Sequence, residues 1–344
     1  MRVLVSAIEP SANLHLRYIL NEWKMENGKW KIEGVFDRNL GEPIVDSNEF
    51  NVMGFFDVIP KINLAKKTIN KLAEMSKNVD KVLLIDAPSF NLRLAKKIKE
   101  INPKIEIIYY ILPKVWAWKR GRIREVNKYI DKKAYIFPFE REFWSDGIYV
   151  GNPLLDEIKE FRDREIKNKV AFLPGSRKSE IKNLMPIFKE LAKKIDKEKV
   201  LVIPSIYKGK IEKIYGNVSE FEICFDTKRA LLNSDFAYIC SGTATLEAAI
   251  IGVPFVLMYK TRWIEYLIAK SLVKLNYVGL ANIIFERENL GEFHKEYLQS
   301  FDINELLKDY KNNNLEEFRE KSKKLREILK FGSSMNVAKL LLDF

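Results

Sequence analysis

Two turns in the second half of the chain combine glycine with hydroxyl residues, and one of them adds an arginine, in a way that suits a phosphate group. The first consists of Ser241, Gly242, Thr243, Ala244 and Thr245. It follows the apolar run Phe236–Cys240 and leads into Leu246–Ile251, which has the pattern of a short helix. Such a turn presents free backbone N–H groups at the positive end of a helix dipole. The same residues are also ordinary helix caps, so this turn alone leaves both interpretations open.

The second turn, at Gly175 and Ser176, follows the apolar run Lys169–Leu173. Arg177 comes next, where a guanidinium group could bind a diphosphate through two parallel hydrogen bonds. Without a ligand, the same residues would form a turn that carries a solvated arginine. Because two such turns occur in the same half of the chain, we favour diphosphate binding.

Two carboxylates in the first half are candidates for acid–base chemistry. Asp86 ends an apolar, strand-like run, so we expect it to project into a cleft, where low-dielectric surroundings raise a carboxyl pKa and suit a general base. The alternative is that Asp86 caps the following helix. Glu9 leaves the first apolar run, and helix capping and ligand contact are equally compatible with its position.

Two tryptophans, Trp116 and Trp118, lie beside the basic residues Lys114, Lys119 and Arg120. Their rings could stack on a sugar, but packing between elements is the simpler interpretation.

Several chemistries lack support in this sequence. His15 and His294 are the only histidines, and their spacing to other ligand types fits no metal motif. The motifs of α/β-hydrolases, P-loop proteins and dinucleotide-binding folds are absent. Cys224 and Cys240 both lie in apolar runs, so we expect reduced thiols and a cytoplasmic protein without a transmembrane segment.

The formal net charge of +12 permits nucleic acid, an anionic membrane or a phosphorylated substrate as partner. The lysines are scattered over amphipathic stretches such as Lys61–Lys77 and Lys178–Lys199, and no nucleic-acid-binding motif accompanies them. We therefore expect mostly solvated helix faces and no nucleic-acid partner.

Strand-like and helix-like patterns alternate along the chain, which predicts parallel, doubly wound α/β sheets. In the first half the strand-like runs are Arg2–Ala7, Lys31–Phe36, Lys81–Ile85, Glu106–Ile111 and Ala134–Phe137, and the helix-like runs are Asn13–Met25, Ile62–Met75, Leu92–Ile101 and Arg120–Tyr129. In the second half the strand-like runs are Lys169–Leu173, Lys199–Ile203, Glu220–Phe225, Phe236–Cys240 and Pro254–Tyr259, and the helix-like runs are Glu180–Ile195, Lys208–Tyr215, Lys228–Leu232, Leu246–Ile251, Trp263–Leu275 and Leu315–Leu329.

Gly151 and Pro153 mark the expected crossing between two Rossmann-like domains, at residues 1–152 and 153–332. We expect a cleft between them, with ligands at the carboxyl ends of the strands. A short amphipathic helix at about 333–344 would return to the first domain or be exchanged with a second copy in a homodimer.

Taken together, several segments resemble the lipid-A-disaccharide synthases, inverting glycosyltransferases with the two-domain GT-B fold, and the resemblance runs nearly end to end. These segments are Ile85–Pro88, Phe90-Asn91, Val115–Trp118, Phe137–Glu140, Val150-Gly151, Leu173–Arg177, Ser179-Glu180, Ser241–Glu247 and Lys270–Asn282.

The resemblance implies that a UDP-2,3-diacylglucosamine donor is joined to the 6-hydroxyl of 2,3-diacylglucosamine 1-phosphate, giving a β-1,6 disaccharide phosphate and UDP without a metal ion or cofactor. It makes Asp86 the expected base, with Glu9 as its rival. The donor-side residues would be Gly175, Ser176, Arg177, the turn from Ser241 to Thr245, Glu247 at the ribose, Asn282 and Gln299. The residues expected at the acceptor or its acyl chains are Ser11, Asn13, Asn91, Trp116, Trp118, Phe55, Phe56, Val58 and Ile59. The apolar segment that contains Phe55, Phe56, Val58 and Ile59 is followed by the basic residues of Ile62–Met75. Together they would also suit the anionic inner face of the inner membrane.

The chain departs from the family pattern on the acceptor side. Ile8, Ala12 and Asn13 stand where the first loop of the family has two glycines and an aspartate, and Ser89 and Asn152 replace an aspartate and a histidine. We therefore expect UDP-sugar recognition to be kept and acceptor handling to be altered, weakened or lost. The alternatives are a UDP-sugar transferase with another lipid acceptor and a non-catalytic, membrane-associated UDP-sugar binder.

Overall fold

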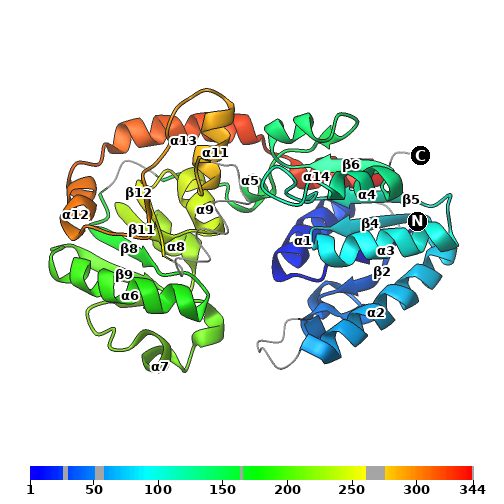
Figure 1. Ribbon diagram of the computed structural model, residues 1–344, viewed down its shortest axis with the longest axis horizontal. Coiled ribbons are helices and arrows are strands. Elements are labelled where there is room, and N and C mark those ends of the chain that lie inside the picture. The colour runs from blue at the N-terminus through cyan, green and yellow to red at the C-terminus, as the bar shows by residue number, and fades with distance from the viewer. Residues whose placement is uncertain (26–29, 51–57, 163–165, 261–275, 343–344) are drawn as a thin grey trace. The chain divides into compact units, whose positions relative to one another are not determined.

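The computed structural model describes residues 1–25, 30–50, 58–162, 166–260 and 276–342. The chain divides into two compact units (Figure 1). The first unit comprises Met1–Glu157 and Leu329–Phe344, and the second unit comprises Ile158–Ile328. Among the described residues, no helix has the length and apolar character needed to cross a membrane.

The first unit is built on a parallel sheet whose described strands run in the order β3-β2-β1-β4-β5-β6-β7. The strands are β1 (Arg2–Ser6), β2 (Lys31–Phe36), β3 (Val45–Asp46), β4 (Lys81–Ile85), β5 (Glu106–Tyr110), β6 (Lys132–Tyr135) and β7 (Ile148–Tyr149). The order reverses between β1 and β4, which pair in register from Val3↔Lys81 to Ser6↔Leu84. In open α/β sheets, the crevice outside the carboxyl ends of the strands at such a reversal is the usual ligand site.

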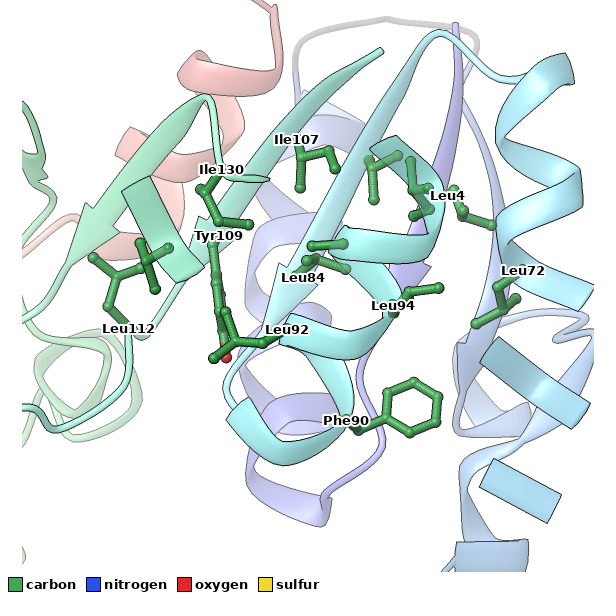
Figure 2. Packing of buried hydrophobic residues seen from close by; sticks show 14 of the residues in the cluster. Leu4, Leu72, Leu84, Phe90, Leu92, Leu94, Ile107, Tyr109, Leu112 and Ile130 are labelled. Carbon is green, nitrogen blue, oxygen red and sulfur yellow. The ribbon is translucent and has the colours of Figure 1, made fainter. Parts of the chain in front are cut away.

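The helices of the first unit form two groups, and the helices within each group contact one another. One consists of α2 (Val58–Met75), α3 (Pro88–Ile101) and α4 (Arg122–Tyr129), and the other of α1 (Pro10–Met25), α5 (Pro153–Glu157) and α14 (Ser333–Leu342). Figure 2 shows the core on the α3 side, where Leu92 and Leu94 of the helix approach Leu84 of the sheet. Every residue of β4 is buried, as expected of a central strand covered on both faces.

The second unit repeats this arrangement with a parallel sheet whose described strands run in the order β10-β9-β8-β11-β12-β13. These strands are β8 (Lys169–Leu173), β9 (Glu198–Val202), β10 (Glu222–Cys224), β11 (Phe236–Cys240), β12 (Phe255–Tyr259) and β13 (Glu296–Leu298). Here the reversal lies between β8 and β11, which pair in parallel from Phe236↔Val170 to Ile239↔Leu173.

Helix contacts again define two groups in the second unit. One includes α6 (Lys178–Lys193), α7 (Ile211–Tyr215) and α12 (Ile303–Lys311), and the other includes α8 (Thr227–Leu232), α9 (Thr243–Ile251) and α11 (Leu280–Arg287). Helix α13 spans Leu315–Leu329. The core contains aromatic rings from three elements, with Phe172 of β8 between Phe188 of α6 and Tyr238 of β11. The helix expected at Trp263–Leu275 lies outside the described residues.

The carboxyl-terminal helix α14 packs against α1 of the first unit. Asp156 accepts hydrogen bonds from the N–H groups of Gly332 and Ser334, at 2.8 and 2.7 Å, and so caps the start of the helix. Ser333 is hydrogen-bonded to the hydroxyl of Tyr110 at 2.7 Å. These bonds tie the end of the chain to α5 and to β5, the strand that neighbours β4.

Candidate active site

In the first unit, the two candidate carboxylates follow the two strands at the reversal of the sheet. Glu9 comes three residues after β1, and Asp86 directly follows β4. Because β1 and β4 are adjacent strands, the two residues follow neighbouring strand ends, and the negative charge of Asp86 contributes to raising the pKa of Glu9. The strand order therefore brings together residues that are 77 positions apart in the sequence.

Asp86 and Ala87 hold an unusual backbone conformation between β4 and α3. Their φ angles are +48° and +45°, in the left-handed region that residues with a Cβ rarely adopt. The carboxylate of Asp86 accepts a hydrogen bond from the N–H of Ala87 at 2.8 Å, and Ala87, the helix N-cap, has no side-chain cap. Asp86 is thus not the N-cap that the alternative interpretation requires. Two consecutive strained residues at a strand end are typical of functional sites.

The strained turn is held by two buried side chains. The carbonyl oxygen of Asp86 accepts hydrogen bonds from the Asn91 amide and the Tyr109 hydroxyl, both at 2.7 Å. Asn91 also donates to Ile85 O at 3.1 Å and accepts from the Ser6 hydroxyl at 2.6 Å. Together they fix the direction in which Asp86 points.

We predict that Tyr109→Phe lowers kcat by about tenfold, because the lost hydrogen bond loosens the turn while Asn91 still holds it. KM for the two substrates should change little, since the lost hydrogen bond lies within the turn. Steady-state kinetics check this, and an unchanged kcat would contradict a positioning role.

The pKa of Glu9 is raised, first by partial desolvation of its carboxyl group and then by the charge of Asp86, while Lys114 lowers it. Two nearby carboxylates whose surroundings differ divide acid and base roles between them. Lys114 follows β5, the next strand of the sheet, so three neighbouring strands supply the charged groups of this site. From the sequence, Lys114 is expected only as a neighbour of the tryptophans. Its position after a strand is the signal that could have placed it at this site.

Two residues expected to contact the acceptor are instead buried supports. Asn91 is 0% exposed, and its amide and carbonyl groups bond within the unit. Asn13 is also buried; it donates to the carbonyls of Ala7 and Glu9 and accepts from the N–H of Asp37. An aspartate could not donate to those two carbonyls, so asparagine fits the present conformation of the loop better.

The two tryptophans differ in their surroundings. Trp116 is buried against Phe137 and Phe139 and donates to Glu140 Oε1 at 3.1 Å, as in the packing interpretation. Trp118 is 50% exposed, and the Lys119 ammonium lies 4.3 Å from its ring centre. Of the two rings, only that of Trp118 is available to stack on a ligand.

Glu140 gives the first unit a pH-dependent stability. Burial raises its pKa to about 7, although hydrogen bonds from Phe137 N, Ile136 N and Trp116 oppose the shift. Because the folded-state pKa lies above the unfolded one, the folded protein binds more protons between about pH 4.5 and 7. We predict that the free energy of unfolding falls by about 3 kcal/mol as the pH rises through this window.

Denaturant titrations at pH 5 and pH 8 measure this effect, with Glu140→Gln as the comparison. The variant loses the titrating group, so the difference in stability between the two pH values should shrink by the same amount. An identical pH dependence in both proteins would show that Glu140 is not the group responsible.

In the second unit, the two glycine-containing turns lie at the reversal between β8 and β11. Gly175 has φ +90°, and a Cβ there would lie 2.5 Å from Glu180 Oε2 and 3.1 Å from Cys240 Sγ. The turn after β8 therefore needs glycine both for its backbone conformation and for the close approach of its neighbours.

The N–H groups of the turn at Gly175 and Ser176 already have a carboxylate partner. Glu180 Oε2 accepts from Ser176 N at 3.2 Å and from Arg177 N at 3.1 Å, while Glu180 Oε1 pairs with the Arg177 guanidinium at 2.8 Å. Glu180 thus closes a capping box at the start of α6. The Arg177 side chain is 77% exposed, so its other N–H groups remain accessible to a ligand.

The start of α9 differs from that of α6. Its N-cap is Gly242, and in the described part of the chain no side chain caps it and no acidic residue lies in its first turn. Helix geometry leaves the N–H groups of Thr243 and Ala244 without intrahelical acceptors. Thr245 is turned inward, and its hydroxyl donates to Gly242 O at 2.8 Å. Of the two turns, the one before α9 therefore leaves its N–H groups more open to an anion.

The remaining donor-side residues fall into two kinds. Asn282 is 0% exposed; it donates to Glu296 Oε1 at 2.8 Å and accepts from Phe293 N at 2.8 Å, so its amide group supports the loop before β13. Glu247, on the second turn of α9, and Gln299, which follows β13 with φ +71°, are partly exposed.

On the acceptor side, Ser11 is exposed in the first turn of α1. Phe55 and Phe56 lie outside the described residues, as do the side chains of Val58 and Ile59.

Both histidines have structural surroundings. His15 Nδ1 lies 2.7 Å from Glu157 Oε1, which links α1 to α5. His294 is buried against Phe255, and burial lowers its pKa to about 4, so the ring stays neutral.

Two Rossmann-like units, each built on a parallel sheet with one reversal of strand order, give the chain the architecture of the GT-B fold. The calicheamicin glycosyltransferase CalG4 matches with a TM-score of 0.58 at 13% identity, over 99% of this chain and 97% of that one. A UDP-GlcNAc 2-epimerase from Neisseria meningitidis, bound to UDP-GlcNAc, matches with a TM-score of 0.60 at 16% identity, over 99% of this chain and 100% of that one. These two likenesses concern the fold.

The sequence defines the family. A model described as lipid-A-disaccharide synthetase matches residues 3–341. Lipid-A-disaccharide synthases from Campylobacter jejuni strain RM1221 and Helicobacter pylori strain 26695 are 46% and 43% identical, over 98% of this chain and 98% and 96% of theirs. The chain belongs to the lipid-A-disaccharide synthase family, the hexosyltransferases of lipid A biosynthesis.

Proposed function

We propose that this chain joins UDP-2,3-diacylglucosamine to 2,3-diacylglucosamine 1-phosphate and releases UDP and a β-1,6-linked disaccharide 1-phosphate. The observation that carries the proposal is the position of its candidate residues. The carboxylate pair and the open helix terminus lie at the two sheet reversals, and the family match covers both. The first unit would handle the acceptor and the second unit the donor, as expected for the domains at 1–152 and 153–332.

Asp86 is the proposed general base. It would take the proton of the acceptor 6-hydroxyl as that oxygen forms a bond to the anomeric carbon of the donor. The bond from that carbon to the diphosphate breaks at the same time, and the configuration inverts. Glu9, whose pKa is raised by partial desolvation and by the charge of Asp86, would form a hydrogen bond with the acceptor and leave the base role to Asp86.

The leaving diphosphate would bind at the start of α9. The N–H groups of Thr243 and Ala244 would donate to its oxygens, with the helix dipole favouring the negative charge that develops as UDP departs. Arg177 would add a guanidinium from the neighbouring turn, once part of its pairing with Glu180 is exchanged for phosphate. Glu247 would accept hydrogen bonds from the ribose hydroxyls.

Incubation of the purified protein with both lipids, followed by mass spectrometry, tests the reaction. We expect one disaccharide monophosphate, and UDP in equal amount. A product from another acceptor would replace this proposal with a different UDP-sugar transferase. UDP binding without product from any acceptor would favour a non-catalytic homologue.

The acceptor and the donor are both acylated, so we also propose that the protein works at the anionic inner face of the inner membrane. Its net charge of +12 favours such a surface. Sedimentation with vesicles that contain anionic lipid tests this association, which should weaken as salt is added. Homodimerisation remains a prediction, and light scattering of the purified protein measures it.

A further inference from the structure

An apolar groove of about 670 Å³ lies in the first unit between α2 and α3. We call it the α2–α3 groove. Its lining consists of Ile8, Phe50, Ile62, Ala65, Lys66, Ile69, Ser89, Phe90, Arg93, Lys96, Lys97 and Glu100.

The floor of the groove is hydrocarbon. Ile62, Ala65 and Ile69 recur at helical spacing on α2 and present one apolar stripe, in which Ile62 is 58% exposed. From the α3 side, Phe90 packs edge-on against Phe50, with ring centres 5.8 Å apart. A floor formed by these apolar side chains suits an alkyl chain better than a polar ligand.

The rim of the groove is basic. Four basic residues and one acidic residue line it among the described residues, and the acidic one, Glu100, already pairs with Lys97 at 3.6 Å. Arg93 and Lys96 are exposed on α3 and form no ion pair with any residue that the structure describes. Their charges are therefore available to an anionic group placed over the apolar floor.

One end of the groove reaches the carboxylate pair. Ile8 precedes Glu9, and Ser89 lies three residues after Asp86. The Ser89 hydroxyl also accepts a hydrogen bond from Arg122 at 3.1 Å. A ligand in the groove would thus have one end beside the proposed base.

We propose that the α2–α3 groove binds an acyl chain of the phosphorylated acceptor and that Arg93 and Lys96 bind its phosphate. This inference rests on the proposed function and adds to it a determinant of acceptor choice. A glycolipid with an acyl chain along the groove and its phosphate over the rim matches both the apolar floor and the basic charge. A neutral or deacylated sugar matches neither.

The test compares Arg93→Gln/Lys96→Gln with Lys67→Gln/Lys71→Gln. The control pair removes the same charge from exposed positions of α2 outside the groove lining. We expect the first variant to raise KM for the phosphorylated acceptor about 10–100-fold. Its kcat and its KM for the donor should stay near the wild-type values. KM for the dephosphorylated acceptor should also stay near the wild-type value. The control should behave as the wild type does.

A second variant tests the floor. Ala65→Trp fills the groove from a partly buried position of α2 that lines it, and circular dichroism checks that the fold is kept. Wild-type affinity for the acceptor should rise about fourfold with each methylene that the groove buries, and the variant should lose this dependence on chain length.

Three results would overturn the inference. One is an unchanged preference for the phosphorylated acceptor in the Arg93/Lys96 variant, and another is an unchanged chain-length dependence in Ala65→Trp. The third is a loss of binding to anionic vesicles with no change in acceptor KM in detergent, which would make the groove a membrane contact. If no acceptor gives product, calorimetry of acceptor binding to the same variants tests the groove separately from the reaction.

Discussion

Replacing Asp86 by asparagine is expected to lower kcat by about 10²–10⁴-fold, because the amide cannot take the proton of the acceptor hydroxyl. The change keeps the size of the side chain and leaves the backbone bonds from Asn91 and Tyr109 intact. The fold and the affinity for UDP should therefore be unchanged. Single-turnover rates with both lipids measure the chemical step, and calorimetry with UDP provides the binding control.

Glu9→Gln is the matched comparison. The glutamine side chain keeps the size and the hydrogen-bonding capacity of Glu9 and removes its charge, so we expect a loss of about tenfold or less. The substitution also removes the carboxyl group whose pKa the charge of Asp86 raises. If Asp86→Asn keeps full activity and Glu9→Gln abolishes it, the two roles are reversed and Glu9 is the base.

Ala244→Glu is expected to weaken UDP binding by about 10–100-fold. A carboxylate in the first turn of α9 would compete for the N–H groups of Thr243 and Ala244 and repel the diphosphate. The same charge should stabilise the helix by about 0.3–1 kcal/mol, since it interacts favourably with the helix dipole. Binding and stability therefore change in opposite directions, which separates a lost ligand site from a damaged fold.

Ala244→Gln serves as the control for this substitution. It adds a side chain of similar size without the charge, so UDP affinity should fall by a few-fold at most. Calorimetry gives the affinities and thermal unfolding gives the stabilities. Equal losses of affinity in both variants would point to steric obstruction, and unchanged affinity in both would place the diphosphate elsewhere.

Much of the fold could be predicted from the sequence because its central strands are strongly apolar. The runs at Lys81–Ile85 and Phe236–Cys240 coincide with β4 and β11, whose residues are all buried. The strands that were missed, β3, β7 and β13, have two or three residues each, too few for a periodic pattern. Helix α11 was also missed; its first turn belongs to the Lys270–Asn282 stretch that was read only as family resemblance.

The candidate site could be predicted in outline but not in detail. Residue types and strand ends were sufficient to predict that Asp86, Glu9 and the two turns lie at the carboxyl ends of central strands. Whether a polar residue faces the ligand or supports the backbone depends on burial, which is why Asn91 and Asn282 were assigned to substrate contact. The capping of α6 by Glu180 likewise depends on side-chain geometry, although Arg177 and Glu180 have the spacing of a capping box.

The central claim is that proton removal depends on the first unit and diphosphate binding on the second. One experiment tests it most directly, a kinetic comparison of Asp86→Asn and Ala244→Glu over a range of donor concentrations. The account predicts that Asp86→Asn lowers kcat with little change in donor KM, whereas Ala244→Glu raises donor KM and recovers much of kcat at saturation. Loss of kcat alone in both variants, or a rise in donor KM in Asp86→Asn, would contradict it.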